Sequence, residues 1–274
     1  MAVTYWVGGT SGDMTVGANY AGGAAPSGGD SVIFNTGSRT VTVGPGVNLA
    51  DVTCTSGWSG SFGSVGSPIT FQNVTGTFKW AGSGDGCYIA IGSTYTCAAF
   101  VAQRGEVAIS GAGTLTALYV ENANVNVTVT ALTSYYGMTP SSRITIGTSG
   151  TAVGTESWSY GVVDVTDRNV TTSRIVGKNG RMYTRGATAL TTAHVQDGAI
   201  LNSNSSGTIT TANVGGQNSL ITPVNSQYNT ATITTLNVFS GGTYVQYANG
   251  TQFTIGTLNV YGGQSAPATP SSGL

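Results

Sequence analysis

From residue 115 to 262 the sequence returns to one short theme. Each repeat has two or three small polar residues, then an alternating apolar trio, then a turn of Gly, Asn or Asp, as in TTSRIVGKNG, TTAHVQDGAI, TTANVGGQNS and TTLNVFSGGT. The same place in five repeats is held by residues spaced 20, 19, 24 and 22 apart, namely Ile175, Val195, Val214, Val238 and Val260. A period of roughly 20 residues is what one coil of a β-solenoid requires.

Stacked coils explain why such a weak repeat folds at all. One coil of two or three short strands cannot bury its own apolar side chains, whereas neighbouring coils bury a continuous core. No stretch between these strands carries the apolar period of a helix, which disfavours leucine-rich and βαβ repeats. The predicted class is all-β, a single-stranded parallel β-helix or β-solenoid; an antiparallel β-sandwich or jelly roll shows the same alternation and stays open as the alternative.

The repeats divide the chain into three predicted parts. Residues 1–48 are rich in aromatic and turn residues and differ from the rest, so we expect an N-terminal cap that protects the first coil. Residues 49–262 are predicted to form the solenoid. Residues 263–274 are short, polar and uncharged, which is typical of a flexible C-terminal tail.

Composition narrows the possible partners. Only 7% of residues are charged and the formal net charge is -1, so long-range attraction to nucleic acid is not expected. No segment has the roughly 20 uninterrupted apolar residues that span a bilayer, which predicts no membrane insertion. Disorder competes with folding in a chain with 42 glycines, but 39% hydrophobic residues and 13 tyrosines favour a buried interior.

The cysteines and the N-terminal residues show no metal-binding, redox or Sec-signal motif. The three cysteines have no CxxC pair and no histidine cluster, so neither a metal site nor a cofactor is predicted. We expect them to be small buried hydrophobes, with a bond between Cys87 and Cys97 as the alternative. The N-terminal MAVTYWVGG lacks the basic and apolar regions of a Sec signal.

The opening of the chain carries a resemblance. Trp6, Gly8, Asn19-Tyr20, Gly23, Pro26 and Gly29-Asp30 precede the strand SVIF. This order resembles the start of Gly- and Thr-rich β-helical proteins, among them phage virion proteins that decorate capsids or form fibres and autotransporter-like surface proteins. The resemblance covers about 40 residues and implies a β-helix with a cap, but no activity.

Catalytic constellations are weak in this sequence, and we predict no enzyme. Glycoside cleavage needs two carboxylates across one bond. Stacking of coils could bring together Glu106 with Glu121, or Asp164 with Asp167, but no further signature accompanies either pair. The single histidine, His194, lies in the repeat trio AHV and is predicted to be a strand residue rather than part of a triad.

Two groups of residues are candidate contact sites. Five of the nine basic residues fall between positions 168 and 185, namely Arg168, Arg174, Lys178, Arg181 and Arg185. This cluster predicts either solvated loops with local ion pairs or a contact patch for a partner protein or an acidic glycan. The second group is aromatic and consists of Trp58, Trp80, Trp158 and Tyr160. These rings could stack on sugars, although packing in the core is the simpler expectation.

These observations favour a structural part over a metabolic enzyme. The resemblance implies a bacteriophage virion protein that decorates or cements the capsid or forms a short fibre. Its expected partners are capsid or other virion proteins. We also expect a homo-oligomer, with a trimer favoured, in which the subunits cover one another's strand edges. One alternative is a tailspike-like protein that binds or depolymerises polysaccharide. Another is an adhesin at the bacterial cell surface.

Overall fold

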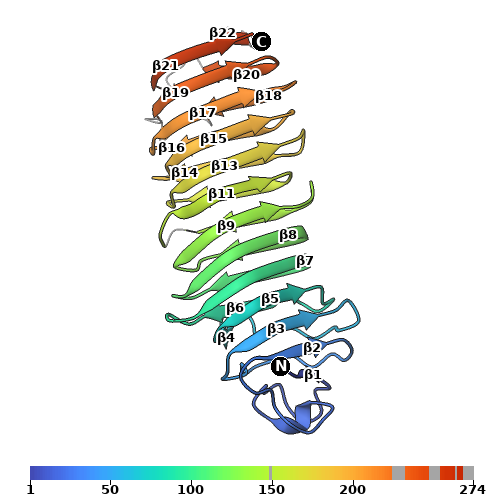
Figure 1. Cartoon of the computed structure of the whole chain (residues 1–274). Coiled ribbons are helices and arrows are strands. Elements are labelled where there is room, and N and C mark those ends of the chain that lie inside the picture. The colour runs from blue at the N-terminus through green and yellow to red at the C-terminus, as the bar shows by residue number, and fades with distance from the viewer. Residues whose placement is uncertain (148–149, 224–231, 247–253, 263, 268–274) are drawn as a thin grey trace. The chain divides into compact units, whose positions relative to one another are not determined.

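The computed structural model describes residues 1–147, 150–223, 232–246, 254–262 and 264–267. The chain forms two compact units. Unit 1 comprises Met1–Tyr136 and Ser141–Thr145, and unit 2 comprises Gly137–Pro140 and Ile146–Leu274. Nearly every element is a β-strand, and each unit is described by itself (Figure 1).

Unit 1 holds the first strands of the chain and one short 3-10 helix. The strands of unit 1 pair in parallel, and the two longest, β7 and β8, run side by side over their length. The elements are β1 (Val3–Tyr5), η1 (Gly17–Asn19), β2 (Asp30–Phe34), β3 (Leu49–Cys54), β4 (Ile69–Phe71), β5 (Val74–Trp80), β6 (Cys87–Ile91), β7 (Thr96–Ser110), β8 (Thr114–Val127), β9 (Ala131–Gly137) and β10 (Arg143–Ile146), the last two reaching the boundary with unit 2.

Aromatic rings fill the N-terminal part of unit 1. The register of β2, β3, β5, β7 and β8 places inward-facing residues in columns, one of which runs Val32, Val52, Phe78, Phe100 and Leu118. The rings of Phe78 and Phe100 stack with centroids 4.8 Å apart. Phe62, from a loop, contacts five further rings: Phe34, Trp58, Phe71, Phe78 and Trp80. Large flat side chains therefore set the thickness of this core.

The first residues of unit 1 are held by polar contacts and buried rings. Asn19 is buried, and its amide oxygen accepts the backbone N–H groups of Thr10 and Ser11 at 2.9 and 3.0 Å. The hydroxyl of Tyr20, also buried, donates to the carbonyl of Met14 at 2.9 Å. Asp30 accepts two backbone N–H groups, as expected for a carboxylate in a turn. That this segment acts as a cap stays a prediction.

Unit 2 is a regular two-strand coil. Odd-numbered strands pair with odd, and even with even, so that each coil contributes one strand to each of two parallel ladders (Figure 1). The strands are β11 (Val153–Ser159), β12 (Val162–Thr166), β13 (Val170–Val176), β14 (Arg181–Gly186), β15 (Leu190–Gln196), β16 (Ile200–Ser205), β17 (Ile209–Gly215), β18 (Ser219–Pro223), β19 (Thr232–Phe239), β20 (Gly242–Gln246), β21 (Thr254–Tyr261) and β22 (Gln264–Pro267).

The strand register confirms the predicted repeat. Ile175 pairs with Val195, Val195 with Val214, Val214 with Val238, and Val238 with Val260. The first four of these side chains are 0% exposed, so they form one inward column of the core. Every pairing between named strands that the register gives is parallel, and the antiparallel sandwich and jelly roll are thereby excluded.

Turns between the coils use the residues that the sequence indicated. Asp197 and Asn218 have positive φ angles of 56° and 65°. The φ angles of Gly216 and Gly241 are also positive, at 81° and 76°. Gly241 also stacks on the preceding turn, because a Cβ there would lie 2.9 Å from the carbonyl carbon of Gly216. Left-handed backbone conformations and close turn stacking together explain why Gly, Asn and Asp recur.

The described strands extend beyond the predicted start of the C-terminal tail. Strand β22 pairs in parallel with β20, so regular strand pairing continues past residue 263, where we expected the tail to begin. Residues 268–274 lie outside the described residues. No helix within the described part of the chain has the length and apolarity needed to cross a membrane.

Candidate functional site

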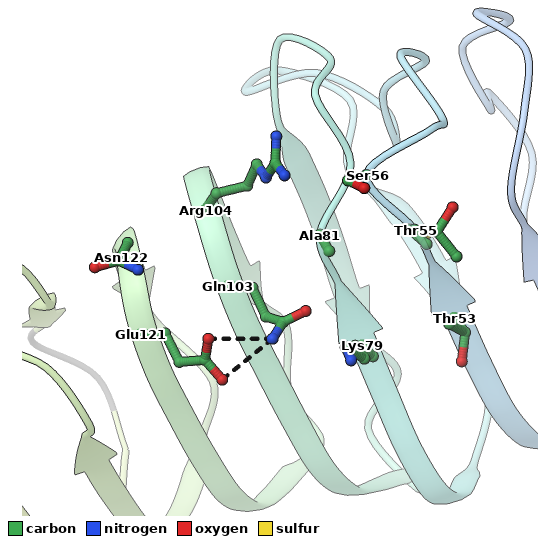
Figure 2. A pocket seen from close by; sticks show the side chains of 10 residues that line it. Thr53, Thr55, Ser56, Lys79, Ala81, Gln103, Arg104, Glu121 and Asn122 are labelled. Carbon is green, nitrogen blue, oxygen red and sulfur yellow. Dashed lines mark hydrogen bonds between the residues drawn. The ribbon is translucent and has the colours of Figure 1, made fainter.

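A groove on the outer surface of unit 1 is a candidate ligand site. It encloses about 480 Å³ over strands β3, β5, β7 and β8 (Figure 2). Ala81 forms part of its floor, since this small residue directly follows β5 and its backbone N–H donates to the carbonyl of Cys54 at 2.9 Å. Cys54 also lines the groove, and the other lining residues are polar or charged: Thr53, Thr55, Ser56, Lys79, Gln103, Arg104, Glu121 and Asn122.

Two cations border this groove. Lys79 lies between Thr53 and Val101 in the outward column of the ladder, and Arg104 follows Gln103 on β7, with its side chain directed toward the loops in Figure 2. Within the described residues, neither the Lys79 ammonium nor the Arg104 guanidinium has a hydrogen bond or an ion pair to another side chain. Both charges are therefore available to a bound anion.

Glu121 supplies the one carboxylate of the groove. The side-chain amide of Gln103 donates to both Glu121 oxygens, at 3.2 and 3.1 Å (Figure 2). The amide thereby orients the carboxylate, because the two side chains come from adjacent strands at the same outward position. An oriented carboxylate on β8, beside the strands that carry the two cations, could accept hydrogen bonds from hydroxyl groups of a polar ligand.

The carboxylates that the sequence suggested as pairs each have a local partner. Opposite Glu106 in the β7–β8 register lies Asn124, whose amide donates to both Glu106 oxygens at 3.1 and 3.0 Å, so Glu121 lies elsewhere on β8. Asp164 pairs with Arg185, and Asp167 accepts the backbone N–H of Ala187 at 2.6 Å. Each of these carboxylates is thus held by a local hydrogen bond or ion pair.

The five basic residues from 168 to 185 are spread over unit 2. Arg168 is buried, and its Nε donates to the carbonyl of Thr151 at 2.9 Å; burial lowers the pKa of this guanidinium. Arg174 on β13 pairs with Glu156 at 2.9 Å, and Arg185 on β14 pairs with Asp164 at 2.9 Å, which raises the pKa of Arg185 chiefly through the hydrogen bond. Arg181 donates to the carbonyls of Lys178 and Gly180.

The contacts of these basic residues limit which of them could belong to the predicted contact patch. Arg174 and Arg185 lie on different ladders of the coil, and each has a carboxylate partner. Arg168 is only 1% exposed and offers no charge to a partner at the surface. The structure therefore shows local ion pairs around these residues, and a role of Lys178, Arg181 and their neighbours at an interface stays a prediction.

The four aromatic residues proposed for sugar stacking fall into two groups. Trp58 and Trp80 are 0% exposed, so neither ring can reach a ligand on the surface, and both contribute to the aromatic core of unit 1. Trp158 and Tyr160 lie on the outside of unit 2, where their rings meet edge to face with centroids 5.5 Å apart. Tyr160 is 41% exposed. A stacking role is left with these two residues.

The cysteines are buried and free, as expected for small hydrophobes. Burial raises the pKa of the Cys97 thiol to about 12, and it raises the pKa values of Cys54 and Cys87 as well. The thiolate is the nucleophilic form, so these cysteines are chemically inert at neutral pH. No group of three or more metal-ligating side chains occurs among the described residues.

His194 lies in strand β15, as predicted, and its imidazole is on the outer face. Its register partners are Arg174 on one side and Asn213 on the other. Burial, and next the nearby Arg174 charge, lower the pKa of His194 below 6.5. The ring is therefore neutral at physiological pH, and it belongs to a polar column of side chains rather than to a triad.

Sequence reasoning missed the groove of unit 1 because its members are far apart in the chain. Lys79, Gln103 and Glu121 belong to successive coils, and only the strand register brings them together. Their separations, 24 and 18 residues, bracket the length of one coil, so a repeat pattern extended into unit 1 was the signal that could have found them.

No family model, curated protein or solved structure matches this chain. The fold of each unit agrees with the β-helical architecture that the N-terminal resemblance implied. The solenoid is compatible with fibre-like, tailspike-like and adhesin proteins, and the choice among them is a proposal.

Proposed function

We propose that this protein is a non-enzymatic structural component of a bacteriophage virion, which decorates or cements the capsid or forms a short fibre. The observation that carries the proposal is the repeated core, in which the same position of successive coils is filled by Ile175, Val195, Val214 and Val238 with no exposure. Parallel strands locked in this way resist bending and local opening, which suits a part that must stay rigid on a particle.

The outer surface also fits an assembly role. Outward positions carry hydroxyl and amide side chains, for example Thr192, Thr211 and Thr235 in one column of unit 2. Such groups make many modest hydrogen bonds to a partner without the desolvation cost of buried charge. Capsid or other virion proteins are the partners proposed, with self-association into a trimer to cover exposed strand edges.

Immunoelectron microscopy of purified phage particles tests the virion proposal. Antibodies against the folded protein should label intact particles, and the chain should band with them in a density gradient at a constant ratio to the major capsid protein. Labelling confined to the envelope fraction of bacterial cells contradicts the proposal and supports a cell-surface adhesin. Light scattering of the purified protein checks the trimer separately.

A second candidate function is binding of acidic polysaccharide in the groove of unit 1, as in a tailspike-like protein. The observation in its favour is the pair of cations, Lys79 and Arg104, at a polar groove that also contains the oriented Glu121 carboxylate. Cations and hydroxyl acceptors in one hollow match a sugar chain that carries carboxylate or phosphate groups.

Binding to bacterial capsular polysaccharides distinguishes this candidate. The double variant Lys79→Gln/Arg104→Gln should lose binding of an acidic polysaccharide by about tenfold or more, whereas Arg143→Gln, which removes an exposed charge elsewhere in unit 1, should retain it. Release of reducing ends that stops in Glu121→Gln would show cleavage. Equal binding by the double variant and the control rules the groove out.

A further inference from the structure

The odd-numbered ladder of unit 2 carries three outward columns of different chemistry. The first is hydroxylic and includes Thr172, Thr192, Thr211, Thr235 and Thr257. The second begins with Trp158 and continues with polar side chains, namely Arg174, His194, Asn213, Asn237 and Asn259. The third follows the ends of the strands and contains Val176, Gln196, Gly215, Phe239 and Tyr261.

The asparagines of the second column form a hydrogen-bonded ladder with a direction. The side-chain amide of Asn259 donates to the Asn237 oxygen at 2.9 Å, and that of Asn237 donates to the Asn213 oxygen at 2.8 Å. The Asn213 amide nitrogen then lies 3.5 Å from Nδ1 of His194. Because an amide nitrogen only donates, this contact is a hydrogen bond in the tautomer whose Nδ1 is unprotonated and whose Nε2 carries the proton.

Arg174, the next residue of this column, is already engaged. Its guanidinium pairs with Glu156 and donates to the Gln196 side-chain oxygen at 3.0 Å. The charge of Arg174 is therefore compensated, and His194 is neutral. The column offers oriented neutral donors and acceptors rather than free positive charge.

The third column has a gap that opens a hollow. Gly215 follows Val214, the register partner of Val238, and therefore lies beside Phe239 in the neighbouring coil. A Cβ on Gly215 would lie 3.1 Å from the Cβ of Phe239, so glycine keeps the space next to the ring open. The hollow measures about 430 Å³ and is lined by His194, Gln196, Asp197, Asn213, Gly215, Gly216 and Phe239.

The ring of Phe239 is positioned to bind a flat partner. Tyr261 stacks on it with centroids 5.1 Å apart and an angle of 14° between the planes, which supports the ring from the side of the last coil. Phe239 is nevertheless 40% exposed, and it lines the hollow above Gly215. An exposed apolar ring held in place beside polar groups is suited to receive an apolar surface of a ligand.

We propose that this hollow is a binding subsite for an uncharged sugar unit of a polysaccharide. The apolar face of a pyranose ring packs against Phe239, while its hydroxyl groups reach Nε2–H of His194, the Asn213 amide and the Asp197 carboxylate. Aromatic stacking combined with a few placed polar groups is the usual composition of a small-molecule site. Among the described residues that line the hollow, the single charge is the Asp197 carboxylate, which is negative and disfavours acidic sugars.

The same face extends the subsite along the stacking direction. Trp158 and Tyr160 lie on the first coil of this ladder, four strands away from Phe239, at a separation of roughly 19 Å for strands about 4.8 Å apart. Polar side chains of Arg174, His194 and Asn213 lie between these two aromatic sites. An oligosaccharide laid across the strands, rather than a single sugar, therefore matches the surface.

Nuclear magnetic resonance of the single histidine tests the subsite directly. The His194 ring signals should shift and saturate when a neutral oligosaccharide such as maltoheptaose, a dextran oligomer, mannohexaose or chitohexaose is added. The variant Phe239→Leu should weaken the bound sugar's affinity by about tenfold or more, because it keeps an apolar side chain but removes the ring.

Matched variants distinguish this subsite from nonspecific binding to any exposed ring. Tyr5→Leu removes a ring from unit 1 that is 46% exposed, against 40% for Phe239, and should bind like the original chain, as should Arg143→Gln. Circular dichroism of each variant checks that the fold is kept. Silence of the His194 signals with every neutral oligosaccharide overturns the proposal, as does equal affinity of Phe239→Leu, or preference for a sulfated sugar or a proline-rich peptide. None of these outcomes bears on the virion assignment.

Discussion

The two units fill the same kind of coil in different ways. Unit 1 packs large rings against one another, with Trp58, Phe62, Phe78 and Trp80 all 0% exposed. Unit 2 uses short aliphatic columns such as Val195 and Val214, accompanied by buried hydroxyl groups. In unit 1 some rings, such as Trp58 and Phe62, enter the core from outside the named strands, whereas the unit 2 column repeats small aliphatic side chains at matching strand positions. The contrast shows that parallel stacking tolerates either type of filling as long as each coil matches its neighbours.

Removing a central ring should have the largest effect. Phe62→Ala deletes a side chain that contacts five other rings and should lower the free energy of unfolding of unit 1 by about 3–5 kcal/mol. Hydrogen exchange measured by mass spectrometry should rise in unit 1 peptides and change little in unit 2. Uniform acceleration across both units would show that the aromatic core supports the whole chain.

The matched change in unit 2 should be smaller. Val195→Ala removes two methyl groups between Ile175 and Val214 and should cost about 2 kcal/mol, because less apolar volume is lost than at Phe62. The faster exchange should be confined to the coils on either side of β15. A loss as large as that of Phe62→Ala would contradict the distinction between the two cores.

The buried hydroxyl groups of unit 2 provide a subtler comparison. Thr184 donates to the Ser203 hydroxyl at 3.1 Å, and both side chains are 1% exposed. Thr184→Val should destabilise by about 1–2 kcal/mol, since it leaves Ser203 without this partner in the interior. The double change Thr184→Val/Ser203→Ala should recover most of that loss in urea unfolding. Additive losses would mean that the pair is not coupled.

The smallest expected effect concerns pH. The pKa of His194 is lowered in the folded protein, first by burial and then by Arg174, while Glu156 opposes the shift; Asp197 lines the same hollow. The unfolded chain then binds the proton more readily than the native one. Stability of unit 2 should therefore decline slightly as pH falls below 6.5 and be fully present above it.

A histidine titration followed by nuclear magnetic resonance measures this directly. We expect a midpoint below 6.5 in the original chain and a higher one in Arg174→Gln, which removes the nearby positive charge. A midpoint above 6.5 in the original chain would show that carboxylates outweigh burial around the ring.

The repeat of unit 2 was readable from the sequence because chemically similar residues return at one position. Ile175, Val195 and Val214 share both register and type, so periodicity alone predicted their alignment. The coils of unit 1 could not be recognised from the sequence, because Phe62 and Trp58 reach the core from loops and the strand register shifts between Val74 and Thr77. Ring packing of this kind leaves no regular spacing to detect.

The candidate sites were harder to foresee than the fold. Residue type singled out Trp58, Trp80 and Arg168, but burial removes all three from the surface. The polar column of His194 and Asn213 was present in the repeats TTAHV and TTANV, yet its meaning depends on side chains stacking between coils. Contacts between residues about one coil apart are a property of register, and a single sequence does not state the register.

The shared register of Ile175, Val195, Val214 and Val238 has an evolutionary consequence. Successive coils present similar side chains at this position, so an in-frame duplication or deletion of one repeat brings together coils whose core columns still match there. Length can then change in whole steps of one coil without a new core having to arise. Homologous genes should accordingly differ by blocks of 19 to 24 codons in this region, which gives selection a simple means of adjusting molecular reach.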